Sequence, residues 1–288
     1  MIFNKFFILF KIGRKIGKSN IINIVSETHK IPVFIKLFFN LLAFSFSSSN
    51  DTKSKGKENL SESIQEMGTT FIKLGQFLAT RPDIIGEKLS KELESLQDKL
   101  PPFSKKEAEK IIIENLGQSN FDDIIDLSEP IAAASIAQVH KAKIKEDNII
   151  KNVAIKVLRP NIKKIFNDEI DAIMLLAYIV ESLISKTKRL KLIEVVFLFK
   201  EITNHEMDLR FEAAAANEYA ENTKNDLGFF VPKIYWNFTS ESVLTLDWVD
   251  GVSIREKDLL KEKNIETSKI ATNLIQHFLR HAVRDGFF

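Results

Sequence analysis

One lysine lies in a segment whose residue types suit nucleotide binding. The segment is "NVAIKVLRP", Asn152 to Pro160, which is apolar around Lys156. Alternate side chains of a strand share a face, so Ala154 and Lys156 point to one side while their branched neighbours point to the other. A flat base could rest on Ala154 while Lys156 reaches its phosphates. A lysine on an edge strand is more often only solvated, so these residues alone are a weak signal.

A turn of small residues lies just upstream, where a phosphate-binding loop is expected. The segment "PIAAASIAQVHKAKI" has apolar, strand-like runs on both sides of Ala132, Ala133, Ala134 and Ser135. Loops that grip phosphates are usually built from glycines, because they need positive φ angles and unobstructed amides. We expect a β-hairpin to place this alanine-rich turn and Lys156 on adjacent strands of one sheet.

A buried ammonium needs a counter-charge. The helical segment "NHEMDLRFEAAAANEYAEN" offers Glu206, Asp208 and Glu212. Asp208 and Glu212 are four residues apart and share a helix face, whereas Glu206 is rotated away from them. Arg210 follows Glu206 by four residues and could neutralise it locally, and a solvated acidic face is the other interpretation of Glu206. The alanines after Glu212 would let this helix approach a sheet closely.

A second polar group lies off the apolar stripe of an earlier helix. Thr69, Lys73, Gln76 and Thr80 fall together on one side of it. Gly75 lies mid-helix, where glycine costs ~1 kcal/mol relative to alanine. Such a cost suggests that another group approaches the backbone there. A surface lysine beside a tolerated glycine is the alternative.

Metal chemistry finds little support in the sequence. The chain has no cysteine, which excludes disulfides, zinc-thiolate sites and cysteine nucleophiles and fits a reducing compartment. His277 and His281 are four residues apart, a spacing that suits a metal pair. With no third ligand near them in sequence, we expect ordinary helix histidines and assign no metal ligand.

Apolar periodicity and breaker residues predict a mostly helical chain with one small antiparallel sheet, an α+β class. Pro82 is expected to end the first helix after the linker, because the residue before proline avoids helical angles. Ser104 and Glu107 form a capping-box signature for a helix that Gly117 can end. The predicted helices cover roughly 61–81, 87–100, 104–117, 161–185, 190–222 and 267–288, and the predicted strands cover 135–144, 152–158, 229–238 and 242–249.

The first fifty residues are basic. They contain seven Lys or Arg and one acidic residue, Glu27, which gives +6 against +2 for the whole chain. This phenylalanine-rich start could lie on an anionic membrane surface, or it could form an amphipathic helix packed on its own domain. The apolar run 31–46 is shorter than the ~20 residues needed to span a bilayer. Residues 47–59 are polar and are predicted to be a linker.

Several motifs then occur in a fixed order along the chain. They are Lys73-Leu74-Gly75-Gln76, "LQDKLPPF", "PIAAASIAQVHKA", "VAIKVLRP", the Glu-x-Asp of Glu206 and Asp208, and "FEAAAANEY". From about Ser61 to Phe288 the sequence resembles the UbiB/AarF/ADCK family of atypical kinase-like proteins. The residues before Ser61 match only in character.

This resemblance implies a protein-kinase-like N-lobe with a family-specific helical extension before it and the first helix of the C-lobe after it. Lys156 would be the nucleotide lysine, with Glu212 as its ion-pair partner. The alanine-rich turn would replace the glycine-rich loop, and Leu246 would be the gatekeeper before a hinge from Asp247 to Val249. The implied nucleotide-binding residues are Ala132, Ala133, Ala134, Ser135, Val139, Ala154, Lys156, Glu212, Leu246, Asp247 and Val249.

In this family the Lys-x-Gly-Gln helix, here Lys73, Gly75 and Gln76, covers the protein-substrate cleft together with the pair that matches Glu206 and Asp208. The resemblance therefore implies ATPase or small-molecule, lipid-like chemistry linked to ubiquinone biosynthesis rather than protein phosphorylation. The implied cofactor is ATP or ADP with Mg²⁺. The implied partners are a quinone-pathway lipid or biosynthetic proteins and an anionic membrane surface, with no nucleic acid. The implied location is the cytoplasm or, peripherally, the cytoplasmic face of the bacterial inner membrane.

The family's catalytic loop, H-A-D-x-H-P-G-N, and a later metal-binding Asp-x-Gly follow the helix that here ends in "RHAVRDGFF". The sequence stops at Phe288, so we expect a fragment or truncated product that binds nucleotide weakly, hydrolyses none and contains no catalytic residue. Asp285-Gly286 closes a helix and is not the metal-binding motif. The expected divisions are 1–46, 47–59, 60–128 (helical extension), 129–255 (N-lobe) and 256–288 (start of the C-lobe).

Two other functions are compatible with the residues. One is a non-catalytic lipid-binding or scaffold module in which the helices of 61–116 carry the function. The other is an ordinary protein kinase, which the missing glycine loop and the intervening helices disfavour.

Overall fold

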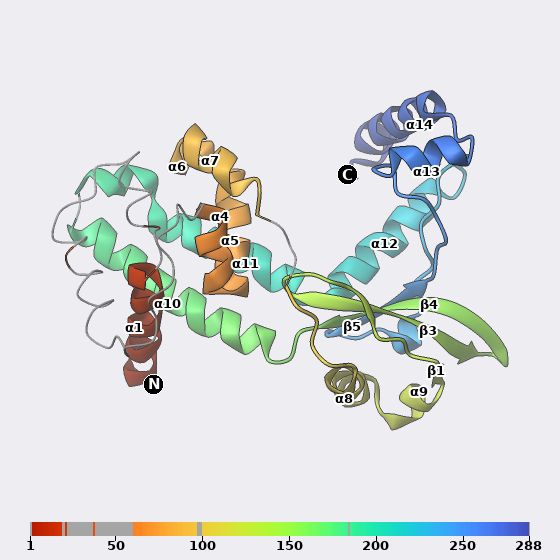
Figure 1. The fold of residues 1–288 in the computed structure, drawn as a ribbon, viewed down its shortest axis with the longest axis horizontal. Helices are drawn as coiled ribbons and strands as arrows, with labels where there is room; N and C mark the ends of the chain where they lie inside the picture. The colour runs from red at the N-terminus through yellow and green to blue at the C-terminus, as the bar shows by residue number, and fades with distance from the viewer. Residues whose placement is uncertain are drawn as a thin grey trace. The chain divides into compact units, whose positions relative to one another are not determined.

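The computed structural model describes residues 2–18, 21, 37, 60–96, 100–183 and 185–287. The predicted linker 47–59 lies outside these residues, as does all of the apolar run 31–46 except Leu37. The described residues combine many helices with one small antiparallel sheet, which confirms the α+β class (Figure 1).

The chain forms two compact units, each built from separate stretches of sequence. The helical unit comprises 1–101, 133–136 and 161–204. The sheet unit comprises 102–132, 137–160 and 205–288. Each is described by itself below.

A long hairpin forms the centre of the sheet unit. Its strands are β3 (Ala137–Glu146) and β4 (Ile149–Leu158), which confirm the two predicted strands on either side of the turn. Asp147 and Asn148 join them with φ angles of 50° and 61°. These residue types tolerate the left-handed region that a two-residue hairpin turn requires.

Three further strands complete the sheet. The strand order is β1-β3-β4-β5, and β2 also pairs with β3. The additional strands are β1 (Ile124–Ile125), β2 (Pro130–Ala133) and β5 (Val243–Asp247). The prediction of a strand over 229–238 is wrong. That segment makes one isolated bridge, from Ile234 to Leu246, and then a 3₁₀ turn, because Pro232 has no N–H to donate to a ladder.

One face of the sheet is the core of this unit. Val153, Ile155 and Val157 alternate along β4 and are fully buried. They pack in a cluster with Ile112 of α8 (Lys105–Leu116). Figure 1 shows α8 and α9 (Gln118–Asp122) on one side of the sheet and α12 (Leu209–Thr223) on the other. The predicted ends of α8 are confirmed, since Ser104 and Glu107 form a capping box and Gly117 ends the helix.

The single long helix predicted over 190–222 is wrong. The structure has α11 (Leu192–Glu206) and α12, with a break at Met207 and Asp208. Asp208 has extended backbone angles and its side chain accepts a hydrogen bond from the Arg210 amide, so it caps α12. Asp208 therefore lies before the helix that carries Glu212, not on a shared helix face.

The end of the sheet unit is helical, as predicted. It contains α13 (Lys257–Glu262) and α14 (Thr267–Arg280), which continues into a π-helical turn, His281–Asp285. Gly286 closes this turn with φ of 64°, so Asp285 and Gly286 end a helix as expected.

In the helical unit, the first predicted helix is interrupted. Gly68 has φ of 103°, which few residues other than glycine adopt, and it divides the segment in two. The second predicted helix ends at Leu93 rather than near Leu100. The helices of this unit are α1 (Ile2–Lys18), α4 (Leu60–Met67), α5 (Thr69–Ala79), α6 (Pro82–Ile85), α7 (Glu87–Leu93), α10 (Ile162–Leu183) and most of α11.

Helix α10 contacts α1 and α5, and α5 in turn contacts α4, α6 and α7. Phe199 of α11 lies against Phe77 of α5 and Phe166 of α10, with ring centroids 5.5 and 5.7 Å apart. Gly75 of α5 is buried against Leu96: a Cβ at Gly75 would lie 2.4 Å from Leu96 Cδ1. The group expected to approach the backbone at Gly75 is thus a leucine side chain.

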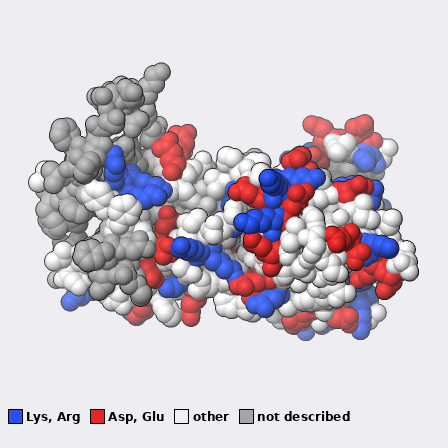
Figure 2. Space-filling model, turned by 90° about the horizontal axis from the view of Figure 1, so that it is seen from below, with Lys and Arg blue, Asp and Glu red and all other residues white. Residues whose placement is uncertain are grey.

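No helix among the described residues is long and apolar enough to cross a bilayer. On the face drawn in Figure 2, basic and acidic side chains are interspersed over the described residues. That face therefore shows no large patch of a single charge.

We expect Gly75→Ala to lower the free energy of unfolding by about 1–2 kcal/mol, because overpacking against Leu96 outweighs the gain in helix propensity. In a Leu96→Ala background the added methyl has room, so the same substitution should be neutral or stabilising. Urea titration of the four proteins measures both effects. Gly251→Ala, where a Cβ would meet nothing within 4 Å, is the control. Equal losses in both backgrounds would contradict this account.

Candidate nucleotide site

The centre of the candidate site is an ion pair between strand β4 and helix α12. Lys156 Nζ lies 3.0 Å from Glu212 Oε1 and 2.7 Å from Oε2. The Lys156 side chain is 26% exposed and that of Glu212 49% exposed. Of the three acidic candidates in the sequence, the structure thus pairs Glu212 with the lysine, and the pair is open to a ligand.

The register of the strands gathers the other candidate side chains around this lysine. Val139 of β3 lies opposite Lys156, and Leu246 of β5 lies opposite Ala154. Residues that face each other across a ladder share one side of the sheet, and this is the side away from the core. All four side chains are partly exposed. Together they form an apolar surface with the Lys156 ammonium at one end.

Asp247 behaves differently from its neighbour Leu246. It pairs with Val153, so its side chain lies on the core side of the sheet. There its carboxylate accepts hydrogen bonds from the Tyr235 hydroxyl at 2.5 Å and from the Lys233 amide at 3.3 Å. Burial and this contact with Asp247 raise the pKa of Tyr235 above its ordinary value. Only the backbone of Asp247 can serve a ligand, whereas Val249 beyond it is exposed.

The alanine-rich turn follows β2. Ala132 is exposed and Ala133 and Ala134 are partly exposed. None of the four candidate residues 132–135, all of which the structure describes, has a positive φ. Ser135 is buried, and its carbonyl accepts a hydrogen bond from Thr69 Oγ1 of α5 at 3.4 Å. The tip of the turn is therefore attached to the helix that carries Lys73.

The remaining motif residues occupy α5 and the break between α11 and α12. Lys73 and Gln76 are partly exposed on α5. Glu206 is exposed at the end of α11. The Arg210 guanidinium pairs with Asp208 at 2.6 and 2.9 Å, because the cap places that carboxylate beside it. That Arg210 neutralises Glu206 stays a prediction.

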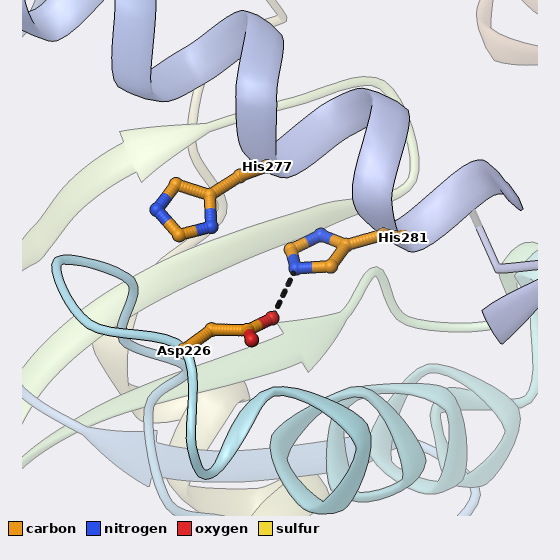
Figure 3. A group of neighbouring side chains, drawn as sticks. All are labelled: Asp226, His277 and His281. Carbon is orange, nitrogen blue, oxygen red and sulfur yellow. Dashed lines mark hydrogen bonds and ion pairs between the residues drawn. The ribbon is translucent and has the colours of Figure 1, made fainter. Parts of the chain in front are cut away.

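A second group of titratable side chains lies at the other end of α12. Figure 3 shows Asp226, from the loop after α12, beside His277 and His281. One ligand atom of each lies within 4.8 Å of the others, and His277 Nδ1 is buried without a hydrogen-bond partner. The sequence argument that the histidines lack a third ligand is therefore wrong, because folding brings in a residue about fifty positions away that no spacing rule would find.

Two arginines and a histidine already surround this carboxylate. Arg284 contacts both oxygens of Asp226, at 2.9 and 3.0 Å, Arg280 contacts one at 3.2 Å, and His281 Nε2 contacts one at 3.0 Å. The hydrogen bonds from Arg284 hold the pKa of Asp226 well below its ordinary value against the opposing effect of burial, and His281 and Arg280 lower the pKa by smaller amounts. A His₂Asp set suits zinc, but a dication here would have to displace two guanidinium groups.

The chain is similar in sequence to several known proteins. Residues 95–288 match a family described as the ABC1 atypical kinase-like domain. A protein of Marinobacter nauticus named "Probable protein kinase UbiB" is 33% identical over 260 residues, 90% of this chain and 47% of that protein. A Cellvibrio japonicus protein of the same name is 31% identical over 90% of this chain and 46% of its own length. The chain thus spans about half the length of these curated relatives.

One solved structure is also similar. It is the complex of Rv3197 with erythromycin from Mycobacterium tuberculosis, which is 25% identical in sequence. The match covers 64% of this chain and 44% of that one, with a TM-score of 0.41.

The Asp226 network predicts a specific dependence of stability on pH. An unfolded aspartate titrates near pH 3.9, and the folded pKa is lower, so the folded state favours the ionised form. The resulting stabilisation is fully present above the unfolded pKa and is lost as pH falls through the folded pKa. We therefore expect Asp226→Asn to lower the urea midpoint equally at pH 7 and pH 5. The difference from the unsubstituted protein should shrink below about pH 4, and a constant difference would contradict the assignment.

Proposed function

The chain belongs to the ABC1 atypical kinase-like family, and from this premise we propose that it binds ATP or ADP on the sheet face that carries Lys156. The ion pair between Lys156 and Glu212 carries the proposal. A carboxylate on a separate helix holds the ammonium in a fixed direction while about a quarter of the side chain stays exposed. A phosphate group needs such a pre-positioned, accessible cation.

The neighbouring residues suit the other parts of a nucleotide. The base would lie on Val139, Ala154 and Leu246, and the backbone from Asp247 to Val249 would contact its edge. The turn 132–135 would lie over the phosphates. Mg²⁺ would arrive with those phosphates, and we assign no side chain of this chain to it. Lys156 would hold the phosphates, and Glu212 would keep the lysine side chain in place.

We further propose that the protein acts in ubiquinone biosynthesis as an atypical kinase-like component, without phosphorylating proteins. The family description and the name UbiB of the relatives support the kinase-like class and the pathway. The proposal that proteins are not phosphorylated rests instead on the alanine-rich turn, whose backbone stays out of the left-handed region that glycine-rich loops use. The substrate of such chemistry would be a lipid-like quinone precursor.

One observation favours a second function, a lipid-binding or scaffold module. The described part of α1 exposes Phe7 (67%) and Phe10 (37%), and the helix also carries Lys11, Arg14 and Lys15. Exposed aromatic residues on a basic helix suit an anionic membrane surface. In this alternative, binding of lipid would not depend on Lys156, and the location would be peripheral at the inner membrane.

Thermal unfolding with MgATP or MgADP tests the nucleotide site. We expect saturating nucleotide to raise the Tm by several degrees, since ligand at about 100 Kd adds ~2.7 kcal/mol to the folded state. Lys156→Ala should abolish the shift. Lys151→Ala is the matched control, because Lys151 lies on the same strand and pairs with Glu146 instead. A shift that survives Lys156→Ala would contradict the proposal, and vesicle binding that ignores Lys156 without any nucleotide shift would support the scaffold alternative.

The alanine-rich turn gives a separate prediction. Ala132→Gly or Ala133→Gly opens the left-handed region to the turn, so we expect an altered affinity for nucleotide or an altered preference between ATP and ADP. Isothermal titration of both variants with both nucleotides measures this. Binding that is unchanged in both variants would count against a role for the turn.

A further inference from the structure

Helix α12 is held at its ends and scarcely in its middle. Leu209 and Ala213 near its start are 1% and 0% exposed, and Thr223 at its last residue is 4% exposed. Between them, Ala214, Ala215, Asn217 and Glu218 are all exposed. Small exposed side chains provide little packing, so the position of this helix depends on what holds each end.

The first end is attached to the sheet and its flanking loop. The Leu209 amide donates to the carbonyl of Glu241 at 3.0 Å, and Asp208 caps the helix. The Lys156–Glu212 pair adds little of its own, because exposed ion pairs contribute about 0–1 kcal/mol. The pair therefore depends on the placement of α12 and cannot by itself produce that placement.

The second end is attached to the π-helical turn that follows α14. The Tyr219 hydroxyl lies 2.6 Å from His281 Nδ1. Arg284 donates to the carbonyl of Asn222 at 2.9 Å and holds Asp226, just beyond α12, with two contacts. The Tyr219 ring also stacks on Phe287, with centroids 5.0 Å apart. π-Helical turns are rare, but those that occur are often found at functional sites. Both His281 and Arg284 of this turn contact α12.

The two ends are linked by a stiff element. Glu212 and Tyr219 are seven residues apart, which is close to two turns, so they lie on nearly the same side of α12 about 10 Å from each other. The residues between them are mainly alanine, the strongest helix former. A displacement at Tyr219 is therefore transmitted to Glu212 by rotation or tilt of the whole helix.

We propose that the cluster of Tyr219, Asp226, His281 and Arg284 is a positioning device for the nucleotide lysine. It fixes the far end of α12 and thereby keeps Glu212 beside Lys156. None of these four residues contacts the nucleotide in the proposed pose, so each acts through α12. The expected effect of this cluster on nucleotide affinity rests on the proposed function, whereas its effect on the position of α12 does not.

The test uses Tyr219→Phe, which removes one hydroxyl and keeps the stacked ring. Glu221→Gln is the matched control, because it breaks an exposed pair with Lys224, at 3.3 Å, on the same turn of α12. Hydrogen exchange without nucleotide is measured at the amides of 213–216, which bond to the first turn. We expect Tyr219→Phe to speed their exchange about tenfold with little change in Tm, and Glu221→Gln to leave it unchanged.

Nucleotide titration of the same proteins gives the second measurement. Tyr219→Phe should weaken binding several-fold, and Arg284→Lys, which keeps the charge but loses the two-pronged contact, should do the same if Tyr219→Phe fails to fold. Faster exchange confined to 219–223, with 213–216 and affinity unchanged, would overturn the proposal. Faster exchange at 213–216 in a chain that binds no nucleotide would support the positioning of Glu212 and refute the proposed function.

Discussion

An ion pair that joins residues 56 positions apart, Lys156 and Glu212, sets the demands on the sheet unit. Because the pair is partly exposed, it is too weak to organise the elements that carry it. The sheet must therefore present its lysine from one face while its other face is buried in the core. The helix must stop and restart at Asp208, so that α12 can take its own direction across that face. Packing of the core and capping of α12 place the two residues, and the ion pair forms as a result.

The alanine-rich turn is stiffened in a related way. Alanine disfavours positive φ, and the turn stays out of that region, so it gives up the freedom that glycines provide. The turn is also attached to α5 through Ser135 and Thr69. Gly75 on that same helix provides the room that Leu96 needs rather than flexibility. The turn and the ion pair thus each depend on a helix, α5 for the turn and α12 for the pair.

The sequence predicted the parts whose signals are local. The alternation of apolar residues around Lys156 predicted β4, and the capping-box residues Ser104 and Glu107 predicted the start of α8. The prediction was wrong where two local signals compete. The apolar stripe through Gly68 predicted a continuous helix, but the positive φ of Gly68 interrupts it. The pattern through Asp208 also predicted a continuous helix, but Asp208 caps a new helix instead. Asp226 could not be found, because its partners are distant in sequence and only the fold brings them together. The comparisons bear out the family resemblance, whereas the roles of Lys73, Glu206 and the turn stay predictions.

The division into two units has a consequence for how the protein is made. The first stretch of the helical unit ends near residue 101. It packs against α10 and α11, whose synthesis is complete only after residue 204. The sheet unit likewise needs β5 and the turn after α14, which follow its other described elements in the sequence. Apolar surfaces on both nascent units therefore stay uncovered through most of translation, a period in which such surfaces are prone to aggregate. The shortest contiguous piece with the whole helical unit, 1–204, also contains much of the sheet unit, and the piece 102–288 contains the whole sheet unit together with α10 and α11. No single cut in the chain therefore separates the two units.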